Sequence, residues 1–207
     1  MINKFLNAKH WQLFTLMFGI PILLQVLTMI SMFSNIDSNG NPDQTGMLSM
    51  IKIFPIIMLL YVGLFFGWFW SIGIGLQKYI PTDIKMKIKK FKIFFFIPLT
   101  YILFLVVTIG TAFYGISSGS NAVGGIVGKM LFVVIPMHLF SMFCIFYLLY
   151  FVSKTIKTTE LKQTVTFSDF IGEFFMIWFF PIGIWFIQPR INKIVSEKST
   201  NGNTVYN

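Results

Sequence analysis

Long apolar runs separated by short polar connections dominate the chain. They predict membrane-spanning helices over about residues 11–33, 47–76, 93–114 and 130–152. A hydrocarbon core of about 30 Å requires roughly 20 helical residues, and each run meets that length. We therefore predict an all-α, polytopic membrane protein that forms a single integral membrane domain over residues 1–207.

A fifth apolar segment, residues 169–188, is unusually short. Its uncharged part, residues 174–187, would extend about 21 Å as a helix, and Pro181 removes an interior hydrogen bond. We predict a re-entrant helical hairpin, with a helix from Asp169 to Phe180, a turn at residues 181–183 and a return to Gln188. The alternative is a fifth transmembrane helix. A polar tail, residues 191–207, follows in either case.

Lysine placement favours the hairpin. Lysines gather in the N-terminal segment, in residues 77–92 and in residues 153–168, whereas residues 34–46 and 115–128 hold none. By the positive-inside rule the lysine-rich segments are cytoplasmic. A fifth span would place Arg190 and the lysines that follow it outside, against that rule. We expect both the N-terminus and the C-terminus to be cytoplasmic.

Composition and charge limit the choice of partners. The chain is 56% apolar, only 11% charged, and carries a formal net charge of +9, which excludes an ordinary soluble domain. Because the lysines lie beside the ends of apolar runs, orientation and anionic lipid explain them before nucleic acid does, and we expect no nucleic-acid partner. The residues expected to contact anionic headgroups are Lys85, Lys87, Lys89, Lys90 and Lys92.

Small residues recur every four positions in the second predicted span, at Gly63, Gly67, Ser71 and Gly75. That spacing places all four on one helix face, which lets the backbone of another helix approach closely. We expect a helix-packing face, within the chain or against another protomer. A role in lining a ligand site is the alternative.

Three ionisable residues in the fifth segment form the main candidate site. Asp169 and Glu173 lie four residues apart on one helix face, and the hairpin would bring Arg190, the only arginine, to the same depth. Such a cluster can form structural ion pairs, bind a cation or transfer protons. Thr166-x-x-Asp169 also matches a capping box, which predicts that a helix begins there.

His138 lies inside the fourth predicted span. An intramembrane histidine is a candidate proton-transfer or ligand-binding group, although hydrogen-bonded structural histidines are common.

The sequence lacks the common catalytic and phosphate-binding motifs and any cysteine or histidine cluster. We therefore expect no metal or cofactor and favour a non-enzymatic accessory or assembly subunit of a membrane complex, with a membrane-protein partner or a second copy of this chain. The alternative is a small transporter or channel with its site at the C-terminal broken helix.

The closing stretch Asp169-Phe-Ile-Gly-Glu-Phe-Phe, followed by Trp178-Phe-Phe-Pro-Ile-Gly-Ile-Trp-Phe-Ile-Gln-Pro-Arg-Ile-Asn, carries a family resemblance. The chain resembles uncharacterised small multipass inner-membrane proteins of flavobacterial type. This resemblance implies a bacterial inner membrane and no known activity.

Overall fold

The computed structural model describes residues 1–34, 44–117 and 123–203; the side chains of residues 32, 44–52, 54, 112–117, 123–131 and 198–203 are outside the description. The described residues are almost entirely helical. The elements are α1 (Ile2–Asn7), α2 (His10–Phe14), a π-helical turn η1 (Thr15–Gly19), α3 (Ile20–Ser34), α4 (Gln44–Gly75), a 3₁₀ turn η2 (Leu76–Tyr79), α5 (Ile88–Ser117), α6 (Val123–Leu161), α7 (Phe167–Trp178) and α8 (Phe180–Asn203).

Four stretches of helix are long and apolar enough to cross a membrane. They run over His10–Ser31, Pro55–Tyr79, Ile88–Thr111 and Phe132–Leu161. The prediction of an all-α protein with four apolar spans is thereby confirmed. The first span passes through α2, η1 and α3, and its π turn ends just before Pro21, which cannot donate a backbone hydrogen bond.

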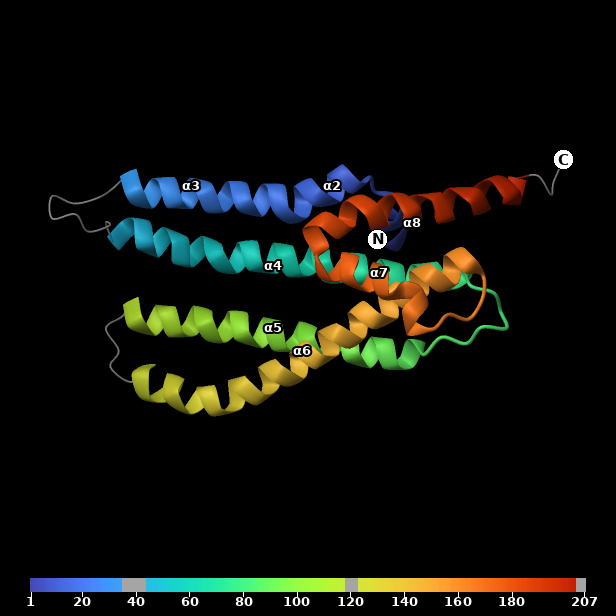
Figure 1. Ribbon diagram of the computed structural model, residues 1–207. Helices are drawn as coiled ribbons and strands as arrows, with labels where there is room; N and C mark the ends of the chain where they lie inside the picture. The colour runs from blue at the N-terminus through green and yellow to red at the C-terminus, as the bar shows by residue number, and fades with distance from the viewer. Residues whose placement is uncertain (35–43, 118–122, 204–207) are drawn as a thin grey trace.

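The four long helices lie side by side along one direction (Figure 1). α3 packs against α4, α5 packs against α6, and α4 contacts both α5 and α6. The turn between α4 and α5, the turn between α6 and α7 and the start of α7 share one end of the bundle. We call this the basic end, because it carries the lysines of residues 78–92 and 154–162.

α7 and α8 fold back on one another at the basic end. Figure 1 shows α7 running towards the middle of the bundle and α8 returning from there. α7 is 12 residues, or about 18 Å, long, which is too short to cross a hydrocarbon core of about 30 Å. α8 continues well beyond its apolar part, so residues 191–203, expected as a polar tail, are helical.

Each arm of this hairpin buries a single stripe of side chains. In α7 the stripe is Phe170, Glu173 and Ile177. In α8 the buried stripe consists of Ile184, Ile187, Gln188, Ile191 and Ile194. Spacings of three and four residues place each set on one helix face, and these faces pack against the rest of the bundle. Two of the buried positions are polar, Glu173 and Gln188.

The break between the arms lies at Phe179. The prediction of a turn at residues 181–183 is therefore wrong, because these residues belong to α8. The carbonyl oxygen of Phe179 accepts hydrogen bonds from the backbone N–H groups of Ile182 and Gly183, so α8 has already begun there. Pro181 is compatible with this position because N–H groups of a first helical turn have no intrahelical partner.

Gly183 allows the two arms to approach closely. A Cβ atom at this position would lie 1.7 Å from the carbonyl oxygen of Met176 in α7. Only a residue without a side chain fits such a contact between backbones. The glycine that the sequence suggested as a turn residue therefore acts as a packing residue.

The small-residue face of α4 packs within the chain, against α1. The Phe5 ring lies 3.0 Å from the position a Cβ would occupy on Gly67. A Cβ on Gly75 would lie only 2.6 and 2.8 Å from side-chain atoms of Ile2 and Leu6. Ser71 bonds its own helix, since its hydroxyl donates to the carbonyl of Gly67 at 2.7 Å.

Replacing Gly183 with alanine should open the hairpin. Because the new methyl group meets the Met176 carbonyl, we expect the free energy of unfolding to fall by about 2 kcal/mol or more, measured by thermal unfolding in detergent. Gly172→Ala is the matched control, because a Cβ there meets nothing within 4 Å. Equal melting temperatures for the two variants would contradict the close approach.

Candidate functional site

A cluster of four charged side chains joins α6, α7 and α8. We call Lys157, Glu160, Glu173 and Arg190 the charged cluster. Arg190 binds Glu160 with two parallel bonds, from Nε to Oε1 at 2.6 Å and from Nη2 to Oε2 at 2.5 Å. The same Nη2 lies 2.5 Å from Oε1 of Glu173, which also accepts a bond from Lys157 Nζ at 3.1 Å.

Burial makes this pairing energetically important. Glu173 is only 4% exposed, and an isolated buried carboxylate is costly. Burial by itself would raise the pKa of the Glu173 carboxyl, but hydrogen bonds from Arg190 and Lys157 outweigh it and hold the pKa below its usual value. Bonds to Glu160 raise the pKa of Arg190 further, despite partial burial. Glu173 and Arg190 therefore remain ionised near neutral pH.

Asp169 has a different role from its two predicted companions. Its Oδ2 accepts hydrogen bonds from the backbone N–H of Thr166 at 2.7 Å and from the Thr166 hydroxyl at 2.8 Å. These bonds lower the pKa of Asp169. The predicted capping box at the start of α7 is confirmed. The structure thus brings Glu173 and Arg190 together, and it places Asp169 apart from them in the first turn of α7.

A buried amide joins α8 to the N-terminal segment. Gln188 is fully buried, and its Oε1 accepts a hydrogen bond from the indole N–H of Trp68 at 2.8 Å. Its Nε2 lies 3.0 Å from the carbonyl oxygen of Phe5 and 2.8 Å from that of Ala8. One turn later, Asn192 Nδ2 donates to the carbonyl of Leu6 at 2.8 Å. These carbonyls lie where α1 ends, so the amides supply partners that the helix itself lacks.

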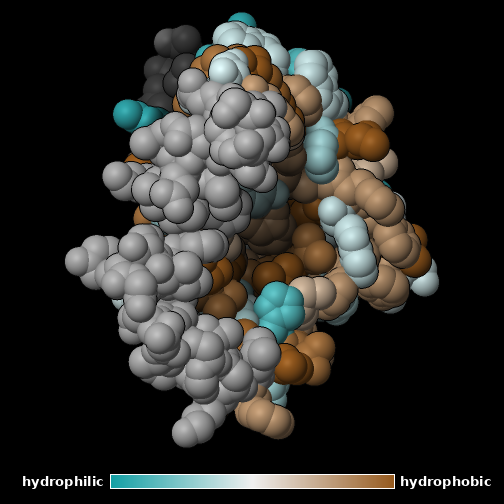
Figure 2. Space-filling model, turned by 90° about the vertical axis from the view of Figure 1, so that its left-hand side faces the viewer, coloured by the Kyte–Doolittle hydropathy of each residue, from teal (hydrophilic) through white to brown (hydrophobic). Residues whose placement is uncertain are grey.

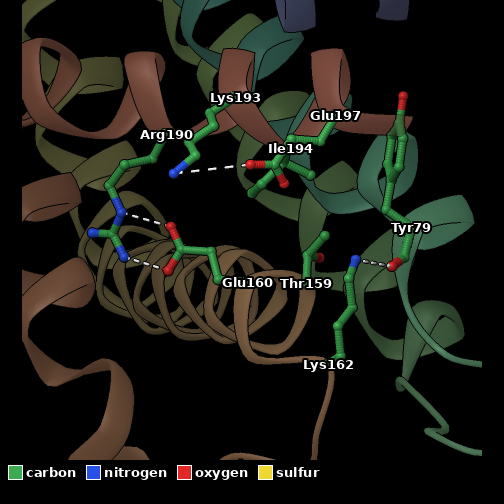
Figure 3. Close-up of a pocket in the computed structure, with 8 residues that line it drawn as sticks. All are labelled: Tyr79, Thr159, Glu160, Lys162, Arg190, Lys193, Ile194 and Glu197. Atoms are coloured by element: carbon green, nitrogen blue, oxygen red, sulfur yellow. Dashed lines mark hydrogen bonds and ion pairs between the residues drawn. The ribbon is translucent and has the colours of Figure 1, made fainter. Parts of the chain in front are cut away.

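A polar cavity of about 650 Å³ lies beside the charged cluster (Figure 3). Its lining comes from η2, from the end of α6 and from α8. Lys162, whose φ of 54° ends α6 in the left-handed region, bonds the carbonyl of Tyr79 at 2.8 Å across this cavity. Lys193 pairs with Glu197 at 3.8 Å on its outer wall, where both side chains are mostly exposed.

The other residues singled out in the sequence lie away from the cluster. In His138, Nδ1 is 3.3 Å from the hydroxyl of Tyr101 in α5, and the His138 side chain is exposed. The lysines predicted to contact anionic lipid are exposed too; they precede α5 or form its first turn, at Lys85, Lys87, Lys89, Lys90 and Lys92.

Lys157 and Glu160 of the charged cluster, and all the residues of the amide contact, were not predicted as site residues from the sequence. Glu160 is a single acid among the lysines of residues 153–168, and that isolation could have marked it as a partner for Arg190. Gln188 and Asn192 share the face of Ile184, Ile187 and Ile191, which indicates buried amides. Their actual partners in α1 and α4 are remote in sequence, so no local pattern reveals them.

The geometry of the charged cluster suits a structural role. Each carboxylate accepts bonds from a cation, and these bonds hold the pKa of the Glu173 carboxyl below its usual value although burial would raise it. Among the described residues, no group of three histidine, cysteine, aspartate or glutamate side chains is arranged to hold a metal ion.

Comparison of the chain with protein-family models, with curated proteins and with solved structures gives no match. No family is therefore identified. Of the resemblance described above, the structure supports the multipass helical architecture with four apolar helices.

Removing the arginine should destabilise the hairpin. Arg190→Ala leaves the buried Glu173 with Lys157 as its remaining cationic partner, and we expect a loss of about 3 kcal/mol in the free energy of unfolding. Lys193→Ala is the control, because an exposed ion pair contributes less than about 1 kcal/mol. Thermal unfolding of both variants at neutral pH measures the difference; equal effects would show that the cluster contributes no more than a surface pair.

Proposed function

We propose that this protein is a non-enzymatic accessory or assembly subunit of a membrane complex. The observation that carries the proposal is the uncovered outer half of α6, residues 132–143. Ile135, Pro136, Met137 and His138 are all exposed. Four consecutive residues point in four directions around a helix, since each turns it by about 100°. In the described part of the chain, side chains on more than one face of α6 are thus exposed over residues 135–138.

His138 argues that protein covers this region. Ionisable side chains in membrane helices face the bundle interior, a water-filled cavity or a partner, because lipid cannot hydrogen-bond them. Here the imidazole contacts Tyr101 and is otherwise exposed on a helix surface rich in large apolar side chains, including Phe132, Leu139 and Phe143. A second membrane protein, or a second copy of this chain, would bury both the ring and those side chains.

Towards the end of the bundle opposite the basic end, described apolar side chains are widely exposed, among them Phe33 of α3 and Val107 of α5. Figure 2, which looks at that end, shows the surface hollowed near its centre among apolar side chains. A cavity of about 260 Å³ lies between α4, α6 and the tip of the hairpin, lined in part by Tyr61, Met142 and Trp178. These exposed side chains and this cavity support docking of a further transmembrane element.

Photo-crosslinking tests the partner surface. A benzoylphenylalanine introduced at Phe140, which is 53% exposed in the outer half of α6, is expected to yield a discrete protein adduct in membranes. The same probe at Ile93 in α5, 59% exposed, is the matched control and is expected to yield none. The adduct mass separates a second copy from another protein. A lone monomer that shows no adduct at Phe140 but transports solute would overturn the proposal.

For the same assembly role we propose that α7 and α8 re-enter the membrane from the cytoplasmic side of a bacterial inner membrane, with both chain termini cytoplasmic. Support comes from the exposed apolar side chains at the tip, Phe179, Ile182 and Phe186, which are 55–63% exposed and would be costly in water. The lysine-rich basic end supports the orientation, by the positive-inside rule.

Cysteine labelling in intact cells tests the hairpin. In a Cys144→Ala background, Ser196→Cys in α8 is compared with Lys85→Cys before α5. A re-entrant hairpin places both cysteines on one side of the membrane, so an impermeant maleimide should label both only after permeabilisation. Labelling of the two cysteines from opposite sides would mean a fifth span and contradict the hairpin.

A second candidate function is a small transporter or channel, favoured by the polar cavity beside Glu160 and Arg190. In that case Glu173→Gln and Arg190→Lys, which keep similar side-chain sizes, should each reduce solute flux in proteoliposomes. Unchanged flux in both variants would remove this candidate.

A further inference from the structure

We propose that a groove over α4, between α1 and α5, binds one anionic phospholipid of the membrane. Its acyl chains would lie along the groove and its phosphate beside Lys78. We call this the α4–α5 groove. Its lining includes the described residues Gly63, Phe66, Trp70, Phe95, Phe96 and Lys78. The groove shares no lining residue with the charged cluster or with residues 132–143 of α6, so the inference stands apart from the assembly role.

The groove has a volume of about 870 Å³. Its aromatic wall is held by ring contacts, with centroids 4.9 Å apart for Trp70 and Phe95 and 5.2 Å apart for Phe66 and Phe95. Preformed, mostly apolar concavities of this size are typical of small-molecule sites.

α1 fills only part of the small-residue face and leaves the rest of it open. Phe5 occupies the notch at Gly67, whereas a Cβ on Gly63 would meet nothing within 4 Å. The floor of the groove is therefore free one turn beyond the last contact with α1. A flexible hydrocarbon chain suits this narrow apolar space.

The charge of the groove lies at one end. Among the described residues that line it, Lys78 is the one with a charged side chain, and it follows the last turn of α4 at the basic end. The exposed lysines of residues 85–92 lie at the same end of the bundle. An apolar trough that ends at an ammonium group matches a molecule with hydrocarbon chains and an anionic headgroup, which is a phospholipid of the inner, anionic leaflet.

Thermal stabilisation by added lipid tests the site in the full-length protein. In neutral detergent, phosphatidylglycerol is expected to raise the melting temperature more than phosphatidylcholine does. Lys78→Gln should abolish at least half of that difference, whereas Lys193→Gln, an exposed lysine outside the groove, should preserve it. Gly63→Phe, which fills the open floor, should remove it. Gly110→Phe, also with nothing within 4 Å of its Cβ, is the steric control.

Native mass spectrometry gives a second measurement on the same proteins. We expect the unmodified protein to retain one phosphatidylglycerol molecule, and the Lys78→Gln and Gly63→Phe variants to lose it. Equal losses for Lys78→Gln and Lys193→Gln would show diffuse attraction and overturn the proposal. The proposal would also be overturned if both lipids raised the melting temperature equally, or if phosphatidylglycerol stabilised Gly63→Phe as much as the unmodified protein. A bound protein chain in place of lipid would overturn it too. If Gly63→Phe does not fold, the two lysine variants still decide the outcome.

Discussion

The hydrogen bonds of one buried amide, Gln188, hold together three parts of the chain that are remote in sequence. Its carbonyl accepts the indole N–H of Trp68 in α4, and its N–H₂ group donates to the carbonyls at the end of α1. An amide at this depth is costly unless its donors and acceptor are bonded. The requirement to satisfy it fixes α8 against α4 and fixes α1 in the gap beside them. The wall that α1 forms along the α4–α5 groove therefore depends on a residue of the hairpin.

The charged cluster applies the same constraint to the other side of the hairpin. Glu173 is buried in α7 and can remain ionised there only because Arg190 from α8 and Lys157 from α6 bond it. Arg190 also binds Glu160 through its planar fork, which a lysine cannot reproduce. The hairpin is thus held against the bundle by hydrogen bonds of side-chain amides on one side and by ion pairs on the other. Gly183 lets its two arms approach closely enough for both sets of bonds to form.

Burial of the described side chains differs along the bundle. Where α7 and α8 pack against the long helices, Trp68, Phe69 and Phe170 are fully buried. In α6, by contrast, residues 132–140 are largely exposed. Lipid or another protein must cover this exposed apolar surface. The proposed partner surface lies there, and the proposed lipid groove runs towards the basic end.

The sequence by itself predicted the four apolar spans and the start of α7 at its capping box. It did so because the length of an apolar run and the spacing of a cap are local properties of the chain. It also indicated a break within residues 169–188, but placed the turn at Pro181 because a proline in a first helical turn and one in a loop look alike in sequence. Only the tertiary structure decided that Glu160, and not Asp169, joins Glu173 and Arg190 in one cluster, and that Gln188 meets Trp68 and α1. The contacts of Glu160 with Arg190 and of Gln188 with Trp68 and α1 join residues 30 to 183 positions apart, and such pairings follow from how helices pack in three dimensions.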